Sequence, residues 1–390
     1  MNTQTSQPIP KVYGWCPGAL RPMMSGDGLV VRIRTPLGRL SQKQAKAIAA
    51  LSQHHGNGLI DLSARANLQL RGISSQSHGA VIAGLQDLGL LDQDAAKESR
   101  RNILLTPFWQ PGDASHSIAR SLERALNAAE DLVLPGKFGF VVDAGAQPHL
   151  QNCAADIRIE CCGDTILLVA DGAQTGCPVT VETAAEAALD LARWFLDHGG
   201  AAQGRGRMQA LTARRAAPLS HSSPRSSSTP QPSPGMTASG QLVALEFGQI
   251  TAEAFATLAD NGPLRLTPWR MILVEDAQEL ATVPGVILDA ADPRLQVRVC
   301  TGAPGCLQAR AATRDLARDL APHVPKGQIL HISGCAKGCA HPGPASLTLT
   351  ATATDTFDLI HHGKASDQPS IETLSASALR AAPDILTEGS

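Results

Sequence analysis

One order of residue patterns occurs twice in this chain of 390 residues, and this repetition constrains the fold more than any other feature. In each copy a helix pattern begins at a Ser or Thr (Ser41, Thr251), ends at Asn-Gly and leads into a short alternating strand. Ser41 has Gln44 three residues later, which is the spacing of a capping box. The repeated order predicts an internal duplication, because a shared order of elements is more informative than a single matching stretch.

The two copies are separated by residues 216–238, a segment made mostly of Ser, Pro, Thr and small residues. Such a segment cannot bury enough apolar surface to offset the entropy of ordering, so it is predicted to be a flexible linker. On both sides of it, strand and helix patterns are mixed without a regular βαβ repeat. The predicted fold class is therefore α+β.

The composition excludes several classes of protein. Hydrophobic residues make up 43% and charged residues 17%, as expected for a soluble globular chain rather than a disordered one. The near balance of 33 Lys+Arg against 35 Asp+Glu, with 3% aromatic residues, gives no reason to expect a nucleic-acid partner. No apolar run is long enough to cross a membrane. The first residues lack the apolar core of a secretory signal, so a cytoplasmic location is expected.

Nine cysteines in a chain of this kind point to reduced thiols and metal ligation rather than disulfides. Four of them form two pairs in Gly-rich surroundings, with five and three residues between the members: Cys300, Cys306, Cys335 and Cys339. Four thiolates suit either a tetrahedral S₄ metal site or a [4Fe–4S] cluster. The neighbouring glycines supply the turns that two tight loops need.

The alternatives for the cysteines are a structural zinc site and an accidental grouping of buried thiols. Zinc pairs usually have two to four intervening residues, which only the second pair satisfies. Four further cysteines lack such Gly turns and are interpreted as small hydrophobic residues: Cys153, Cys161, Cys162 and Cys177. Cys16 is open to either an active-site role or a role in packing or a turn.

The cysteine pattern, following a duplicated unit, resembles that of the nitrite and sulfite reductase superfamily. Members couple a [4Fe–4S] cluster to sirohaem, and the last cysteine of the pattern, here Cys339, bridges the two. The stretches LIDLSARANLQLRG and LPGKFGFVVD are similar to the superfamily's tetrapyrrole-binding segment and its Lys-bearing strand. The resemblance implies a duplicated nitrite/sulfite reductase-like architecture.

Within this superfamily the chain is most similar to the precorrin-3B synthase branch, through CPGALRPMMSGDGLVVRIR, GNGLIDLSARANLQLRGI, LRLTPWR and HISGCAKGCAHPG. The branch implies an oxidoreductase of the monooxygenase type in aerobic cobalamin biosynthesis, with a [4Fe–4S] cluster and a mononuclear non-haem iron. Its reaction uses O₂ and an external electron donor to oxidise precorrin-3A, by hydroxylation at C20 and closure of a γ-lactone. Spacing reveals no ligand set for the second iron.

The resemblance also divides the chain into expected segments. These are a first ferredoxin-like half-domain (11–97), a first nitrite/sulfite reductase-like domain (98–215), the linker (216–238), a second ferredoxin-like half-domain (239–292) and a [4Fe–4S] domain (293–390).

A precorrin is a flat macrocycle surrounded by carboxylates, so its pocket needs several fixed cations, for which Arg is well suited. Alternation along predicted strands places Arg32 and Arg34 on one side. It likewise places four polar residues opposite Leu68 and Leu70: Arg65, Asn67, Gln69 and Arg71. The resemblance adds Lys137 near the reacting centre, so Lys137 and Arg65 are the candidate catalytic residues. For each cation the alternative is an ordinary solvated side chain.

Two other functions remain open from the sequence. A sirohaem-dependent sulfite or nitrite reductase would use the same four cysteines, although the chain is short for that group. A non-catalytic iron–sulfur electron carrier would need neither the duplicated scaffold nor the cationic face.

Overall fold

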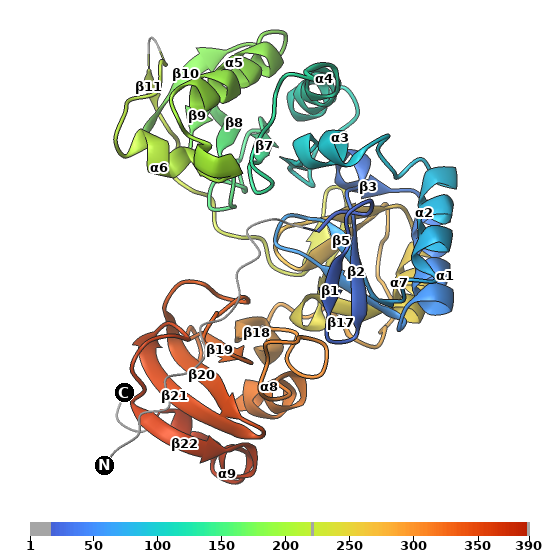
Figure 1. Ribbon diagram of the computed structural model, residues 1–390, viewed down its shortest axis with the longest axis vertical. Coiled ribbons are helices and arrows are strands. Elements are labelled where there is room, and N and C mark those ends of the chain that lie inside the picture. The colour runs from blue at the N-terminus through green and yellow to red at the C-terminus, as the bar shows by residue number, and fades with distance from the viewer. Residues whose placement is uncertain (1–16, 220–221, 388–390) are drawn as a thin grey trace. The chain divides into compact units, whose positions relative to one another are not determined.

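The computed structural model describes residues 17–219 and 222–387. Contacts divide the chain into two compact units. The small unit contains Met24–Gly28 and Asp289–Ser390, and the large unit contains Gly14–Met23 and Leu29–Leu288. Four sheets and their helices confirm the α+β class (Figure 1).

The predicted duplication appears as two matching lists of elements. The first is β1 (Met23–Ser25), β2 (Gly28–Ile33), η1 (Pro36–Gly38), β3 (Arg39–Leu40), α1 (Gln42–His55), β4 (Leu59–Leu62) and β5 (Leu68–Ile73). The second is β12 (Gly235–Thr237), β13 (Gly240–Leu245), η3 (Glu246–Gly248), β14 (Gln249–Thr251), α7 (Ala252–Ala259), β15 (Leu264–Leu266) and β16 (Met271–Glu275). The match extends to the backbone, since Leu37 and Phe247, the central residues of η1 and η3, have φ of 53° and 54°.

Side-chain caps start the two equivalent helices. The Ser41 hydroxyl accepts the Gln44 N–H, and the Gln44 side chain accepts the Ser41 N–H, so the predicted capping box is present at α1. At α7 the Thr251 hydroxyl accepts the Ala254 N–H. These bonds satisfy N–H groups that have no partner within the helix.

The two half-domains exchange a strand. The sheet orders are β1-β2-β5-β4-β14 and β12-β13-β16-β15-β3, so β14 completes the first sheet and β3 completes the second. Ile250 pairs with Ile60 in the first sheet, and Leu40 pairs with Leu264 in the second. The apolar faces of both sheets contribute to one buried cluster, which also includes side chains of α1, α2 (His78–Asp87) and α7. The predicted segments 11–97 and 239–292 therefore share a core.

A third sheet of the large unit has its own core. Its elements are β6 (Ile103–Leu105), α4 (Ala114–Ala128), β7 (Phe140–Asp143), β8 (Ile157–Cys162), β9 (Thr165–Ala170), β10 (Thr175–Val179) and α5 (Ala184–Asp197), with α3 (Ala95–Arg100) before them and η2 (Ala202–Gly204) and α6 (Met208–Thr212) after them. Strands β6, β7 and β8 run parallel, whereas β8, β9 and β10 are antiparallel. Helices α4 and α5 pack together and contribute apolar side chains to the core of this sheet.

The small unit repeats the same topology. It contains η4 (Pro293–Gln296), β18 (Val297–Val299), α8 (Arg314–Leu320), η5 (Ala321–His323), β19 (Leu330–Ser333), β20 (Ala345–Ala353), β21 (Thr356–Gly363), β22 (Ile371–Ser375), α9 (Ala376–Ala381) and η6 (Pro383–Leu386). Strands β18, β19 and β20 are parallel, and β20, β21 and β22 are antiparallel. The order strand, helix, strand, then three-stranded meander thus occurs in both units (Figure 1).

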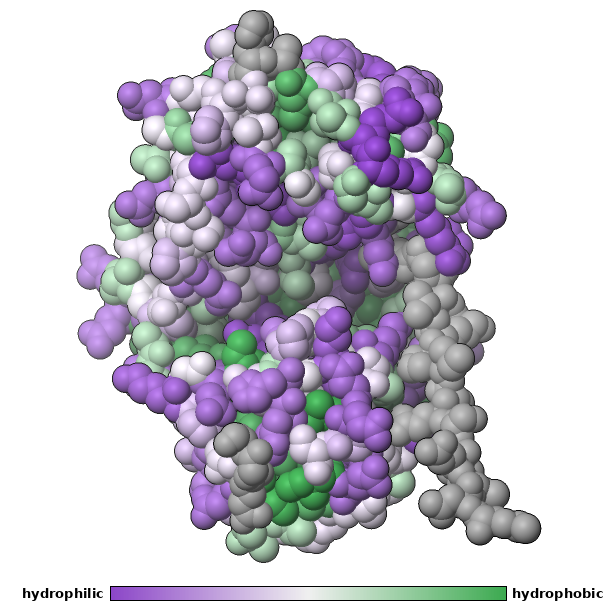
Figure 2. Space-filling view, turned by 90° about the vertical axis from the view of Figure 1, so that its left-hand side faces the viewer, coloured by the Kyte–Doolittle hydropathy of each residue, from purple (hydrophilic) through white to green (hydrophobic). Residues whose placement is uncertain are grey.

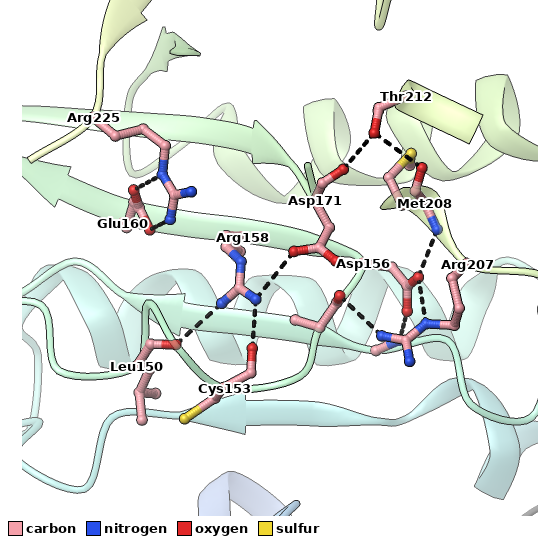
Figure 3. A network of polar contacts seen from close by, with 12 residues as sticks. Leu150, Cys153, Asp156, Arg158, Glu160, Asp171, Arg207, Met208, Thr212 and Arg225 are labelled. Carbon is pink, nitrogen blue, oxygen red and sulfur yellow. Dashed lines mark hydrogen bonds and ion pairs between the residues drawn. The ribbon is translucent and has the colours of Figure 1, made fainter. Parts of the chain in front are cut away.

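Residues 222–238 of the predicted linker are more ordered than the composition of this segment indicates. They contain β11 (Ser223–Pro224), which pairs with β10, and β12. Between them Arg225 makes two hydrogen bonds, of 2.6 and 2.9 Å, to the buried carboxylate of Glu160 (Figure 3). Pairing at a sheet edge and a bidentate ion pair need no apolar side chain, which is why composition did not reveal them.

No helix in the described ranges is long and apolar enough to cross a membrane. Hydrophilic side chains cover most of the face seen in Figure 2.

Candidate functional site

The fold brings the four predicted ligand cysteines to adjacent loops of the small unit. Cys300 directly follows β18, and Cys335 lies two residues after β19. The two strands are parallel neighbours, so their carboxyl ends lie at the same edge of the sheet. The loops that leave this edge carry Cys306 and Cys339. All four thiols are free of disulfides.

The pKa shifts of two of the thiols have the other cysteines among their causes. Burial raises the pKa of the Cys335 thiol, and the neighbouring Cys300 and Cys306 raise it further. Cys339 is the most exposed of the four, yet its pKa is also raised, first by partial burial and then by the other three cysteines. Lys337 acts in the opposite direction on both groups. Without a bound cation the raised pKa values favour the neutral thiols, and a metal centre that binds thiolates would offset the mutual repulsion of their charges.

A single metal ion and an iron–sulfur cluster require different spacings of the four thiols. A tetrahedral S₄ zinc site has Zn–S bonds of about 2.3 Å, which requires sulfur atoms about 3.8 Å apart. Among residues 17–219 and 222–387, no group of three or more His, Cys, Asp or Glu side chains is arranged to hold a metal ion. In a [4Fe–4S] cluster each cysteine binds a different iron, so its ligands are spread more widely. Four free thiols on two adjacent loops fit the all-cysteine donor set of a [4Fe–4S] cluster.

Backbone groups around the cysteines hold the two loops in place. The Gly334 N–H donates to Cys300 Sγ at 3.1 Å, a contact that stabilises negative charge on sulfur. The Thr313 hydroxyl donates to the Cys300 carbonyl at 3.0 Å, and the Ser333 hydroxyl donates to the Cys335 carbonyl at 2.7 Å. Gly302 has φ +69°, and a Cβ there would lie 2.5 Å from the Thr313 hydroxyl, so this turn requires glycine.

The predicted cationic face is located in the large unit, on one side of the first half-domain sheet. Four polar residues occupy opposing positions on neighbouring strands β2, β5, β4 and β14: Arg32, Gln69, Asp61 and Gln249. Arg32 Nη2 donates to the Gln69 side chain at 2.7 Å. Leu68 and Leu70 belong to the core, as the alternation predicted.

Two of the predicted cations are neutralised by buried carboxylates. Arg71 is 4% exposed and bonds Asp61 at 3.0 Å, and Gln249 donates to the same carboxylate at 2.7 Å. Arg34 is 7% exposed and bonds Glu98 at 2.9 Å. These partners come from other elements, so local alternation could not reveal them. The predicted free cationic face is in this respect an oversimplification.

The two candidate catalytic residues meet. Arg65 Nη2 donates to the backbone carbonyl of Lys137 at 2.8 Å, and the Lys137 side chain is exposed. Strand β5 begins only at Leu68, so Arg65 and Asn67 lie in the preceding turn rather than on the strand face. The structure thus joins these two regions by a contact that the sequence pattern did not specify.

Asn67 lines a small cavity that the sequence analysis did not anticipate. Its volume is about 20 Å³, enough for one or two waters, and its lining includes Arg34, Thr35, Arg101 and Glu123. Arg101 bonds Asp92 at 2.8 Å and approaches Glu123 at 3.5 Å. Burial raises the pKa of Glu123. Arg101 and Glu123 carry no local motif of their own, which is why only the three-dimensional structure brings them to attention.

Comparisons with known proteins identify the family. Residues 21–88 match the model of the nitrite/sulfite reductase ferredoxin-like half domain. The chain is 30% identical to a precorrin-3B synthase of Sinorhizobium sp, over 92% of this chain and 85% of that protein. The chain belongs to the precorrin-3B synthase family. Members of this family are oxidoreductases, so the predicted enzyme class is confirmed.

Nitrite reductases are more distant relatives of this chain. A ferredoxin–nitrite reductase of Leptolyngbya laminosa is 23% identical over 90% of the chain and 83% of its own length. The structure of the Mycobacterium tuberculosis NirA protein matches with a TM-score of 0.65 at 16% identity, covering 91% of this chain and 79% of that one. This likeness confirms the expected nitrite/sulfite reductase-like architecture.

The remaining cysteines lie far in sequence from the two loops that carry Cys300, Cys306, Cys335 and Cys339. Cys161 is buried in β8, and burial raises the pKa of Cys153 to about 11, as expected for small apolar packing residues. Figure 3 shows Cys153 beside Arg158, whose guanidinium bonds the Cys153 and Leu150 carbonyls and Asp171. Cys16 lies outside the described residues.

Proposed function

We propose that this chain catalyses the O₂-dependent oxidation of precorrin-3A, with hydroxylation at C20 and closure of a γ-lactone. The observation that carries the proposal is the gathering of four cysteine thiols, from the ends of two parallel strands, in a member of the precorrin-3B synthase family. Electrons would come from an external donor. A cytoplasmic location is proposed with it, because free thiols persist in a reducing compartment.

The four cysteines would hold a [4Fe–4S] cluster: Cys300, Cys306, Cys335 and Cys339. When bound, such a cluster supplies electrons one at a time. The Gly334 N–H, which donates to Cys300 Sγ, would stabilise negative charge on that sulfur. No residue is assigned to a mononuclear iron, and no step depends on it.

The partly exposed polar groups of the large unit would bind the macrocycle's carboxylates. Arg32 and Arg65 present charged donors and Gln69 presents an amide, whereas the amide of Asn67 is buried and lines the small cavity. Arg34 and Arg71 are already paired with carboxylates, so their proposed part is to fix this polar region rather than to supply unneutralised charge. Buried ion pairs of this kind impose geometry even where they add little net stability.

The Arg65–Lys137 contact places a second cation beside the proposed binding region. Because Arg65 bonds the Lys137 carbonyl, the position of the Lys137 ammonium depends on that loop remaining in place. An ammonium there would pair with the ring A acetate and hold its oxygen toward C1. Lactone closure would then be effectively unimolecular, which proximity alone can accelerate by many powers of ten.

The direct test is anaerobic purification, addition of precorrin-3A with O₂ and a reductant, and identification of the product by mass. The proposal expects one added oxygen atom and a lactone. An unchanged substrate, with the cluster present and the reductant competent, would refute it.

The sirohaem reductase alternative is tested by the visible spectrum of the same preparation. Haem-type bands, together with reduction of nitrite or sulfite, would favour it. Over comparable lengths of the chain, the identity is 30% to the precorrin-3B synthase and 23% to the Leptolyngbya nitrite reductase, which favours the precorrin reaction. A mere electron carrier would bind no tetrapyrrole at all.

A further inference from the structure

A hairpin turn distant in sequence contacts the first cysteine loop. Residues Met24–Gly28, which span the end of β1, the turn and the first residue of β2, belong to the small unit by their contacts. The Ser25 hydroxyl donates to the Gly305 carbonyl at 2.6 Å, and the Gly26 N–H donates to the same oxygen at 3.3 Å. One carbonyl immediately before Cys306 thus accepts from two donors on the hairpin.

The carbonyl in question belongs to the peptide group that joins Gly305 to Cys306. The N–H of that peptide group, on Cys306, donates to the Gly302 carbonyl at 2.9 Å. The peptide is therefore held at both ends, by the hairpin at its oxygen and by the loop itself at its nitrogen. Because a peptide group is planar and rigid, holding both ends fixes the Cα of Cys306 and limits where its sulfur can point.

The close approach explains a glycine that no sequence pattern singled out. A Cβ on Gly26 would lie 1.9 Å from the Pro304 carbonyl oxygen and 3.2 Å from the Cys306 nitrogen. Real Cβ atoms do not approach a backbone oxygen so closely, so any other residue would displace the hairpin or the loop. Gly26 is therefore required for the contact that Ser25 makes.

We propose that Ser25 and Gly26 position Cys306 as a cluster ligand, so that the hairpin turn forms part of the metal site. Ser25 acts through the Gly305 peptide and is a positioning residue. The inference rests on the proposed [4Fe–4S] cluster. Loss of the Ser25 hydroxyl leaves the Gly305 carbonyl with one hairpin donor, and Cys306 then departs from its ligating position more often. Release of iron becomes faster, while the ligands themselves are intact.

The duplication supplies a matched control. The hairpin between β12 and β13 contacts the loop that follows β6, where Gln110 donates to the Ser239 hydroxyl at 2.9 Å. This loop corresponds in topology to the one that carries Cys300 and Cys306, yet it contains no cysteine. Ser239→Ala removes a comparable hairpin-to-loop hydrogen bond in the half without the four cysteines.

The experiment compares the anaerobically purified full chain with Ser25→Ala, Ser25→Thr and Ser239→Ala. Each is exposed to an iron chelator, and cluster loss is followed by absorption at about 400 nm. A typical hydrogen bond corresponds to a factor of about three to ten, so Ser25→Ala should lose its cluster that much faster. Ser25→Thr keeps a hydroxyl and should restore the original rate, and Ser239→Ala should match the unmodified protein.

A rate for Ser25→Ala equal to that of the unmodified protein would overturn the inference. Equal acceleration by Ser239→Ala would also overturn it, because the effect would then be general destabilisation. Gly26→Ala should reduce the iron and sulfide content of the purified protein, and full content would contradict the proposed close contact. If the unmodified chain holds no cluster, the proposed function itself fails first and the inference falls with it.

Discussion

The domain around β6–β10 and the domain around β18–β22 share one topology, yet only the second carries the four cysteines. Their hydrogen bonds correspond: the Thr106 N–H donates to the Val142 carbonyl, as the Cys300 N–H donates to the Ile332 carbonyl. Thr106 therefore occupies the position of Cys300. The scaffold offers the same two loops in both domains, and the residues placed on those loops decide whether a metal can bind.

Side chains of the large unit hold the loop that follows β7, which carries no predicted ligand cysteine. Asp143 ends β7, as Ser333 ends β19, and its carboxylate accepts the N–H groups of His149 at 2.6 Å and Leu150 at 2.8 Å. The His149 ring contacts Phe108 and Trp269, with centroids 5.2 and 6.4 Å away. In the domain of β6–β10 a carboxylate and aromatic rings hold the loops in place. In the domain of β18–β22 a bound cluster would help to hold the corresponding loops.

The largest effect is expected when one of the four proposed ligand cysteines is removed. Cys335→Ser removes one of four ligands and should abolish the cluster and its absorption at about 400 nm. Cys153→Ser, in the corresponding loop of the other domain, should leave both unchanged. Measured iron, sulfide and absorption check this prediction, and retention of the full spectrum in Cys335→Ser would refute the ligand assignment.

The two half-domain sheets differ in how their carboxylates are paired. Asp61 has one guanidinium partner, Arg71, whereas Glu275 has two, Arg265 and Arg39. Arg71→Met should destabilise the fold by about 3–5 kcal/mol, because it leaves a buried carboxylate without a cation. Arg39→Met should cost less than about 1 kcal/mol, since Arg39 is partly exposed and Arg265 remains. Urea unfolding measures both, and equal losses would contradict the distinction.

The stability of the protein should depend on pH through Asp143, which ends β7 in the domain without the four cysteines. Burial raises the pKa of Asp143 to about 6, despite its hydrogen bonds to Leu150 and His149. The folded state then holds this proton more tightly than the unfolded chain, so the contribution of Asp143 to stability falls as pH rises from about 4 to 6. The unmodified protein should lose about 3 kcal/mol relative to Asp143→Asn over that range. Urea unfolding at several pH values measures this loss. A difference in the free energy of unfolding between the two proteins that stays constant with pH would contradict the prediction.

The smallest predicted effect concerns the turns that precede β5 and β16. The first presents Arg65, and the second presents Trp269, which packs against Phe108 at 6.3 Å. Arg65→Ala should weaken precorrin-3A binding about tenfold, as expected for one charge-assisted hydrogen bond, and leave the cluster intact. Lys43→Ala removes an exposed cation of α1 and should leave the affinity unchanged. Anaerobic titration without reductant measures both, and unchanged affinity in Arg65→Ala would remove it from the site.

Local patterns predicted the duplicated elements, the capping box at Ser41 and the four cysteines, because these depend on neighbours in sequence. The exchange of β3 and β14 could not be predicted, since either pairing satisfies the same alternation. The carboxylates that pair with Arg34 and Arg71 could not be predicted either, because they lie on other elements of the fold. Helix α8 begins only at Arg314, because the preceding backbone bonds elsewhere, with the Arg310 N–H donating to the Gly334 carbonyl.

The iron and acid-labile sulfide content of the full chain, purified without oxygen, tests the central claim most directly. A [4Fe–4S] cluster on Cys300, Cys306, Cys335 and Cys339 predicts about four sulfides per chain, together with at least as many irons. One zinc per chain without sulfide would show that the four thiols bind a single ion and would contradict the account.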